Sequence, residues 1–436
     1  MTHATDTPPR TALAGRDLTL DLARVVCVIL VVGIHLLFVG VGRRDDGGLV
    51  IERTAEHLPF FDVATWFLDI MPLFFVVGGY ALRAGWRSAM ARGESADRFI
   101  RVRLARLARP ALPLFVFLTV ALGGALALGV DPDLVDTIAI GVGSPLWFLA
   151  AYLLVQACAP GMMRLHERFG VRVPMVLLAA SLLVDVVRLV LVAGILDIGP
   201  VPATGYGFGH ELFGVPNVFA VWLFAQQVGF FLFDGWFARR SVAQLLALVL
   251  GGYGALGALV AVAGYPTSML ANQWPPSAPL AVLAVVQAAT LALLHRPLTM
   301  LMRTKAAQGV VLVVGSRLMT VYLWHLPVIL LLTGLELLLP LPLPTPGSIS
   351  WWSTRPLFLL AVLAVVWLAS LRLVRFEVLP RIAALRFPSP VATVAAVVVF
   401  AAPILGITLY GLDPVLAATA TAATAVALWL TGGRPA

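Results

Sequence analysis

Charged residues are scarce in this chain of 436 residues: 12% are Asp, Glu, Lys or Arg, and 60% are hydrophobic. Soluble domains carry about a quarter charged residues, so this composition excludes an ordinary soluble protein. Lysine is almost missing, since Lys305 is the only one, and the net charge of +8 comes from arginine. The arginines alternate between loops instead of forming one basic surface, so we expect no nucleic-acid partner.

Cysteine is nearly as rare. Cys27 and Cys158 are the only two, and both fall within apolar runs. Two such thiols provide neither a disulfide framework nor the ligands of a zinc cluster, so we expect no bound metal. The first 20 residues are polar, and the first apolar run lacks a small-residue cleavage site after it. We therefore expect no cleavable signal peptide.

Long apolar runs, by contrast, are abundant. A bilayer span needs about 20 apolar residues, and we count roughly twelve such runs. The predicted spans are 22–42, 60–82, 110–130, 145–163, 173–196, 214–237, 241–263, 278–299, 309–338, 357–374, 391–410 and 415–431. The fold class that follows is all-α, a polytopic membrane helix bundle embedded in lipid.

The basic residues between these runs predict the orientation. Alternate loops and the two termini hold 23 Lys and Arg, whereas the intervening loops hold four. Such a bias marks the cytoplasmic side, so we predict a multi-pass protein of the plasma or inner membrane with both termini in the cytoplasm. Arg24, Arg188 and Arg317 fall within spans, where charge is costly and often functional.

The first span carries a notable spacing. His35 follows Arg24 by eleven residues, which places both on one helix stripe about 16 Å apart along the axis, with Val28 and Val31 between them. Asp21 precedes Arg24 by three residues and can hold its guanidinium. A cation at the inner lip and a deeper imidazole suit a long anionic donor in one buried groove. The alternative is a packing histidine and an arginine that extends to the interface.

Five segments, in this order, resemble the acyltransferase-3 family of integral membrane acyltransferases. They are Leu20-Asp21 with Arg24 and His35, Met71-Pro72-Leu73-Phe74-Phe75 with Gly78-Gly79-Tyr80, Arg103 with Arg106, Pro145-Leu146-Trp147-Phe148-Leu149, and Tyr322-Leu323-Trp324-His325-Leu326-Pro327. The resemblance implies a ten-helix core at 17–376, preceded by a disordered cytoplasmic segment at 1–16 and followed by an additional transmembrane pair at 390–431. Gly78 stands where the family has serine, and Met319-Thr320 stand where it has a Ser-Tyr pair.

The resemblance also implies a reaction. The family transfers acyl groups, commonly acetyl, from cytoplasmic acyl-coenzyme A to sugar hydroxyls. Acyl-coenzyme A would thus be a co-substrate, with no permanently bound cofactor, and the acceptor would contain carbohydrate. Arg24, Arg103 and Arg106 would bind the donor phosphates, for which the arginine fork is well shaped. The arginine run has an alternative reading as a topology signal that contacts anionic lipid.

Catalysis is assigned to two residues. His35 would be the general base for the acceptor hydroxyl, or the nucleophile of an acyl-histidine intermediate. Asp69, which we place in the middle of the second span, would pair with Arg24, Arg317 or His35 and so steer the imidazole.

Supporting roles fall to four residues. Asp21 would hold Arg24. Trp147 would stack on a sugar ring or anchor the interface. Tyr322 and His325, on one face of the ninth span, would orient the reactants or join helices through hydrogen bonds.

Two other functions stay open. A carrier or flippase would use the intramembrane charges for ion coupling, and an inactive relative would serve as a scaffold. The sequence leaves the acceptor open among surface polysaccharide, peptidoglycan or lipid-linked glycan, and glycosylated metabolite. It also leaves open the acyl chain length, the oligomeric state and the role of the last two spans.

Overall fold

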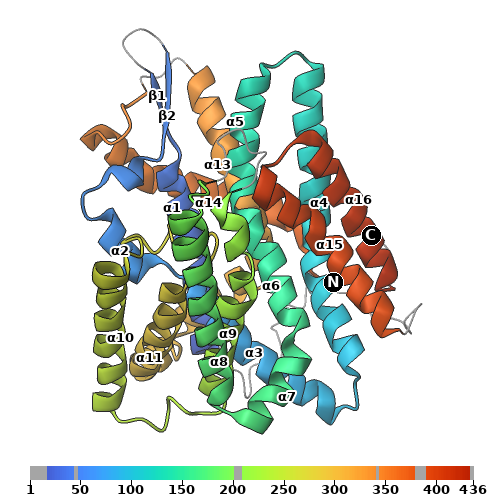
Figure 1. Cartoon of the computed structure of the whole chain (residues 1–436). Coiled ribbons are helices and arrows are strands. Elements are labelled where there is room, and N and C mark those ends of the chain that lie inside the picture. The colour runs from blue at the N-terminus through green and yellow to red at the C-terminus, as the bar shows by residue number, and fades with distance from the viewer. Residues whose placement is uncertain (1–16, 44–47, 201–208, 340–342, 379–388, 433–436) are drawn as a thin grey trace.

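The computed structural model describes residues 17–43, 48–200, 209–339, 343–378 and 389–432, and its helices pack side by side in one bundle (Figure 1). The predicted disordered segment 1–16 lies outside the described residues. The helices are α1 (Leu18–Phe38), α2 (Phe61–Leu68), α3 (Met71–Ala91), α4 (Ala96–Ala127), α5 (Pro132–Gly143), α6 (Trp147–Ala157), α7 (Ala159–Phe169), α8 (Arg172–Asp185), α9 (Asn217–Phe233), α10 (Val242–Ala263), α11 (Ala278–Leu301), α12 (Lys305–Gly315), α13 (Leu318–Leu338), α14 (Ile349–Glu377), α15 (Pro390–Tyr410) and α16 (Pro414–Leu430).

The outer surface of the bundle suits lipid. Within the described residues, eleven helical segments are long and apolar enough to span a membrane, and α16, with 17 residues, is slightly shorter. Large apolar side chains point outward, including Val262 on α10 (86% exposed) and Leu357 on α14 (73%). Water would penalise these surfaces and hydrocarbon does not. The all-α membrane bundle predicted from the sequence is confirmed.

The arginine run before the third span is helical, and the sequence-based loop there is wrong. Helix α4 begins at Ala96, fourteen residues before the predicted start of the span at 110. Ser95 caps it by accepting a hydrogen bond from the Arg98 amide, and Asp97 lies in the first turn, where the helix dipole favours a carboxylate. Arginine is a good helix former, so the basic stretch extends the helix of the third span at its N-terminal end without a break.

Three predicted spans are each divided between two α-helices, among them 145–163, where α6 ends at Ala157 and α7 begins at Ala159. The span at 60–82 breaks between α2 and α3 at Asp69 and Ile70, so Asp69 ends a helix instead of lying in the middle of one. Pro72 favours a new helix start because it has no amide hydrogen to leave unpaired, and Asp69 accepts from the Met71 amide at 3.0 Å. The span at 309–338 likewise divides into α12 and α13, with Arg317 as the N-cap of α13.

The two ends of the bundle differ. The turns between α3 and α4 and between α9 and α10 lie at one end, here called the arginine-rich end (Figure 1). The opposite end carries the antiparallel strands β1 (Gly40–Arg43) and β2 (Leu49–Glu52), with Val41 paired to Ile51. Helix α1 runs between these ends, and it therefore carries Arg24 towards the first and His35 towards the second.

Candidate active site

A cavity of about 1000 Å³ reaches the strand-bearing end of the bundle, where Val41 and Ile51 line it. Helices α1, α2, α5, α6 and α13 supply most of the remaining wall, together with the turn after α15. Four of the nine residues that were given a functional role from the sequence line this cavity, namely His35, Asp69, Trp147 and Tyr322. The fold therefore brings together side chains that are up to 287 positions apart in the chain.

His35 is held by its own helix and by α13. Its Nδ1 lies 2.8 Å from the Val31 carbonyl oxygen and 3.3 Å from Nε2 of His325. Nδ1 of His325 lies 2.6 Å from the Tyr322 carbonyl oxygen, and the His325 side chain is fully buried. The two imidazoles thus form a chain of hydrogen bonds that starts at a backbone carbonyl of α13 and ends at the cavity wall.

These contacts assign the ring protons. A carbonyl oxygen only accepts, so His35 and His325 each carry their proton on Nδ1 when they are uncharged. Nε2 of His325 then accepts from the shared Nδ1–H of His35. Nε2 of His35 is therefore unprotonated and carries a lone pair, and His35 lines the cavity. An imidazole held in this way can act as a general base, because its partner fixes the tautomer.

Asp69 lines the same cavity but does not hold His35. Oδ1 accepts from the Met71 amide, while Oδ2 is buried with no hydrogen bond of ordinary geometry among the described residues. The hydrogen bonds of the described residues join Asp69 to none of its expected partners Arg24, Arg317 and His35. His325 and the Val31 carbonyl orient His35 instead.

Trp147 and Tyr322 shape the wall beside the imidazoles. The Trp147 indole stacks on Trp222, with ring centroids 5.9 Å apart, and faces Trp274 at 6.5 Å. The Tyr322 hydroxyl donates to the Pro145 carbonyl at 2.5 Å, which joins α13 to the segment that leads into α6. Aromatic faces next to a base provide a surface on which a sugar ring can stack.

Arg24 lies at the other end of α1 and is tied to its neighbours. Nη1 contacts Oδ1 of Asp21 at 3.3 Å, the pair that the sequence spacing predicts, and Nη2 donates to the Val77 carbonyl of α3 at 3.4 Å. The Arg24 side chain keeps 26% of its surface exposed. Arg103 of α4 is close enough for the two charges to interact, as is Arg106 to Arg103. Two helices, α1 and α4, thus bring three cations to one region.

The expected continuous groove from Arg24 to His35 is closed in the structure. Arg24 is not among the residues that line the cavity, whereas Val31 is. Val28 lies between them on the same stripe and is only 2% exposed. The reason is packing. Val28 belongs to an apolar cluster formed by α1, α13 and α14, and this cluster fills the position of the groove that was expected from the sequence.

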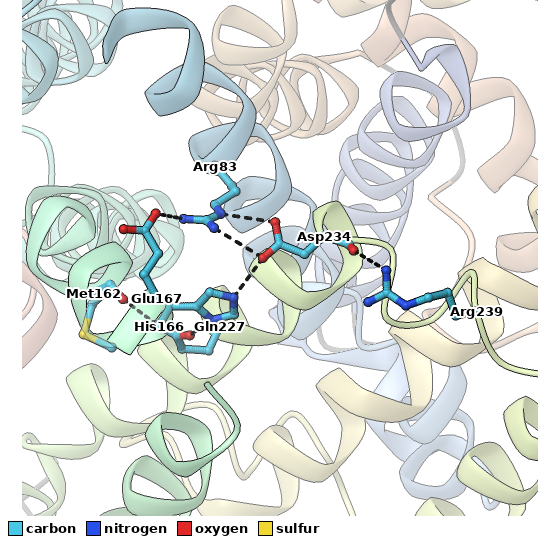
Figure 2. A network of polar contacts seen from close by, with 7 residues as sticks. All are labelled: Arg83, Met162, His166, Glu167, Gln227, Asp234 and Arg239. Carbon is cyan, nitrogen blue, oxygen red and sulfur yellow. Dashed lines mark hydrogen bonds and ion pairs between the residues drawn. The ribbon is translucent and has the colours of Figure 1, made fainter. Parts of the chain in front are cut away.

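Other arginines of the run are used by the fold. Arg101 is fully buried and contacts the C-terminal helices α15 and α16, as described below. Arg83 donates to both oxygens of Asp234 at 3.3 Å and to Glu167 at 2.7 Å (Figure 2). His166 joins the same network through Asp234 at 3.1 Å. These contacts connect α3, α7 and the end of α9 at the arginine-rich end.

Residues 17–371 match the model of the acyltransferase-3 family, described as an acyltransferase domain. This chain belongs to the acyltransferase-3 family. It is a multi-pass membrane acyltransferase. No curated protein and no solved structure gives a significant match to it.

The departures of this acyltransferase from the family motifs have local explanations. A Cβ atom added at Gly78 would lie 2.9 Å from the Tyr152 hydroxyl, so Tyr152 occupies the space that a serine side chain would need. Arg24 and Arg103 are both close enough to act on Tyr152 electrostatically. Sequence reasoning missed Tyr152, because its link to Gly78 is a tertiary contact between α6 and α3. Thr320 binds Glu377 through its amide, at 2.8 Å, and through its hydroxyl, which joins α13 to α14.

Arg188 and Arg317, the other two arginines within spans, make contacts of a packing kind. Arg188 donates to the Pro275 carbonyl at 3.4 Å. The guanidinium of Arg317 lies 4.0 Å from the centre of the Trp367 ring, a cation–π distance. Neither residue is among those that line the cavity.

Proposed function

We propose that this acyltransferase moves an acetyl group from cytoplasmic acetyl-coenzyme A to a hydroxyl of a sugar-containing acceptor. The proposal rests on one observation. His35 lines the cavity, and its Nδ1 is engaged by the Val31 carbonyl and His325, which leaves Nε2 as an available base. Family membership supplies the reaction class, acyl transfer.

The proposed chemistry uses this nitrogen twice. The acceptor oxygen attacks the thioester carbonyl carbon while its proton passes to Nε2 of His35. The carbon–sulfur bond then breaks, and Nε2 of His35 passes the proton to the leaving thiolate. Attack by Nε2 itself, giving an acyl-histidine that the acceptor then resolves, is the second route open to the same atom. In both routes His325 keeps the ring oriented and its Nδ1 protonated.

The donor is proposed from charge and position. Arg24, Arg103 and Arg106 carry three positive charges near the arginine-rich end, which the bias of basic residues predicts to be cytoplasmic. A phosphate-rich nucleotide thioester suits this cluster, and its long arm would need to cover the roughly 16 Å of helix between Arg24 and His35. Because the apolar cluster at Val28 fills this path, donor binding requires α1 and α13 to separate locally.

Two measurements test this proposal. In the first, the purified protein is given labelled acetyl-coenzyme A and the transfer of label is measured. In the second, the masses of surface glycans are compared between cells with and without the gene. His35→Ala and His35→Gln should lose acetyl transfer while the protein remains folded in the membrane. His295→Ala is the matched control, since His295 is 55% exposed and lies outside the cavity. Full turnover by both His35 variants would remove the proposed base. An unchanged set of glycans, together with movement of an unmodified substrate, would instead indicate a carrier.

A further inference from the structure

The cavity has one wall that lies outside the family match. Residues 407–413, which form the end of α15, the turn, and Asp413 at the start of α16, all line it. The family match ends at residue 371. The C-terminal helix pair α15–α16 therefore forms part of the same enclosure as His35, Trp147 and Tyr322.

The helix pair is built into the bundle. Helix α16 packs along α4, and α15 packs along α6 (Figure 1). At the cavity the turn approaches Gly143 so closely that a Cβ there would lie 2.8 Å from the Cβ of Leu412. Gly143 immediately precedes the segment Ser144–Leu146, which leads into Trp147. The turn is thus fixed against the segment that presents an aromatic face of the cavity.

At the opposite end of the pair, Arg101 of α4 holds both helices. Its guanidinium donates to the Thr393 hydroxyl at 2.6 Å and to the carbonyls of Ser389 and Leu430 at 2.9 and 3.1 Å. Asp97 pairs with it at 2.9 Å. A buried cation is stable only when its donors are paired, so this contact fixes the position of the pair relative to α4.

The chemistry of the turn points to the kind of molecule that it contacts. Its lining side chains are mostly apolar, with Leu409, Leu412 and the Tyr410 ring among them, and the Trp147 and Trp274 rings also line the cavity. Apolar and aromatic walls stabilise the hydrocarbon part of a ligand, while the imidazole needs a hydroxyl. An amphiphilic glycoside, a sugar carrying an alkyl or aryl aglycone, meets both requirements.

We propose that the turn at residues 407–413 selects the acceptor, and that it favours a glycoside with an apolar aglycone. This inference rests on the proposed function, because it assigns the acceptor of the same reaction. The C-terminal helix pair then acts as a specificity element added to the catalytic core, and Tyr410 and Leu409 contact the aglycone.

The experiment measures acetyl transfer from radiolabelled acetyl-coenzyme A to octyl and methyl glucoside by protein in lipid nanodiscs, which avoid sugar detergents. The wild type should prefer the octyl glycoside. Tyr410→Ala and Leu409→Ala should each raise its KM by about tenfold, the loss expected for one apolar contact, while the KM for acetyl-coenzyme A changes less than twofold. Val398→Ala, at a position of α15 that is 54% exposed, is the matched control and should change neither constant.

The outcomes separate the two claims. If the wild type acetylates neither glucoside nor any surface glycan, the proposed function fails. If the wild type acetylates glycosides without preferring the octyl one, or if Tyr410→Ala and Leu409→Ala keep that preference, the function stands and the selecting role of the turn is refuted. Tyr410→Phe retains the ring and should retain the preference. It serves as the folded comparison if the alanine variant is unstable.

Discussion

Arg101 offers the sharpest test of how the helix pair is held, and its substitution by methionine is the perturbation to make. Methionine keeps most of the side-chain volume but removes the guanidinium that pairs with Asp97 and donates to the carbonyls of Ser389 and Leu430. Removing one member of a buried ion pair costs about 3–5 kcal/mol. The population in which α15–α16 is separated from α4 should then rise by about 140- to 4,000-fold.

A buried cysteine reports that population. Thr424 on α16 is 1% exposed, so in a variant with Cys27 and Cys158 replaced by alanine, a Thr424→Cys thiol is alkylated only when the pair opens. Its rate of labelling by a membrane-permeant maleimide should rise by about 100-fold or more with Arg101→Met. A cysteine at Ala289, which is fully buried on α11, should keep its rate if the opening is local.

Arg98→Ala is the control within the same helix. Arg98 has 40% of its side chain exposed and contacts Glu94 at 3.9 Å, so its loss should cost less than about 1 kcal/mol and change labelling by less than about fivefold. Equal labelling rates for Arg101→Met and its parent would refute the reasoning. The helix pair would then be held by apolar packing, with the guanidinium contributing little.

Three further predictions follow from the site and its supports. His325→Gln should lower kcat by about 10- to 100-fold and leave the donor KM unchanged, since it disturbs the orientation of His35, and steady-state kinetics separate the two constants. Gly78→Ser and Tyr152→Phe should each weaken donor binding. The double variant should bind better than Gly78→Ser alone, because Phe removes the hydroxyl, the nearest of the Tyr152 atoms that the serine Cβ would meet. Titration with acetyl-coenzyme A measures this, and strictly additive losses would contradict it. Asp234→Asn should lower the midpoint of thermal unfolding by several degrees, because it weakens the bonds to Arg83 and His166, and an unchanged midpoint would show that the network is dispensable.

Apolar length and the bias of arginine were enough to predict the bundle, because both effects are summed over many residues. The ends of individual helices depend on single capping side chains, which averages of hydropathy and charge do not detect. The first span was expected at 22–42, but α1 begins at Leu18, where the Asp17 side chain caps it, and ends at Phe38 before the first strand. The strands themselves were missed, since two four-residue strands add little to a hydropathy average.

The candidate site also has a part that the sequence predicts and a part that it does not. Periodicity placed Arg24 and His35 on one stripe of α1, and that local relation holds whatever packs against the helix. It could not show that Val28 closes the space between them, because the closing side chains come from α13 and α14. Nor could it pair His35 with His325, 290 positions away, or set Tyr152 against Gly78. Such contacts are decided by tertiary packing.

The apolar cluster around Val28 and Val32 has a consequence for the cell as well as for the enzyme. It separates the charged region near Arg24 from the cavity at His35 with side chains that exclude water, since Val28 is 2% exposed and Val32 is fully buried. A water-filled passage at the level of Val28 and Val32 would let protons and small ions leak across the membrane and dissipate its potential. If the proposed acyl transfer takes this route, the valine cluster has to open and close again in each turnover for the membrane to keep its potential.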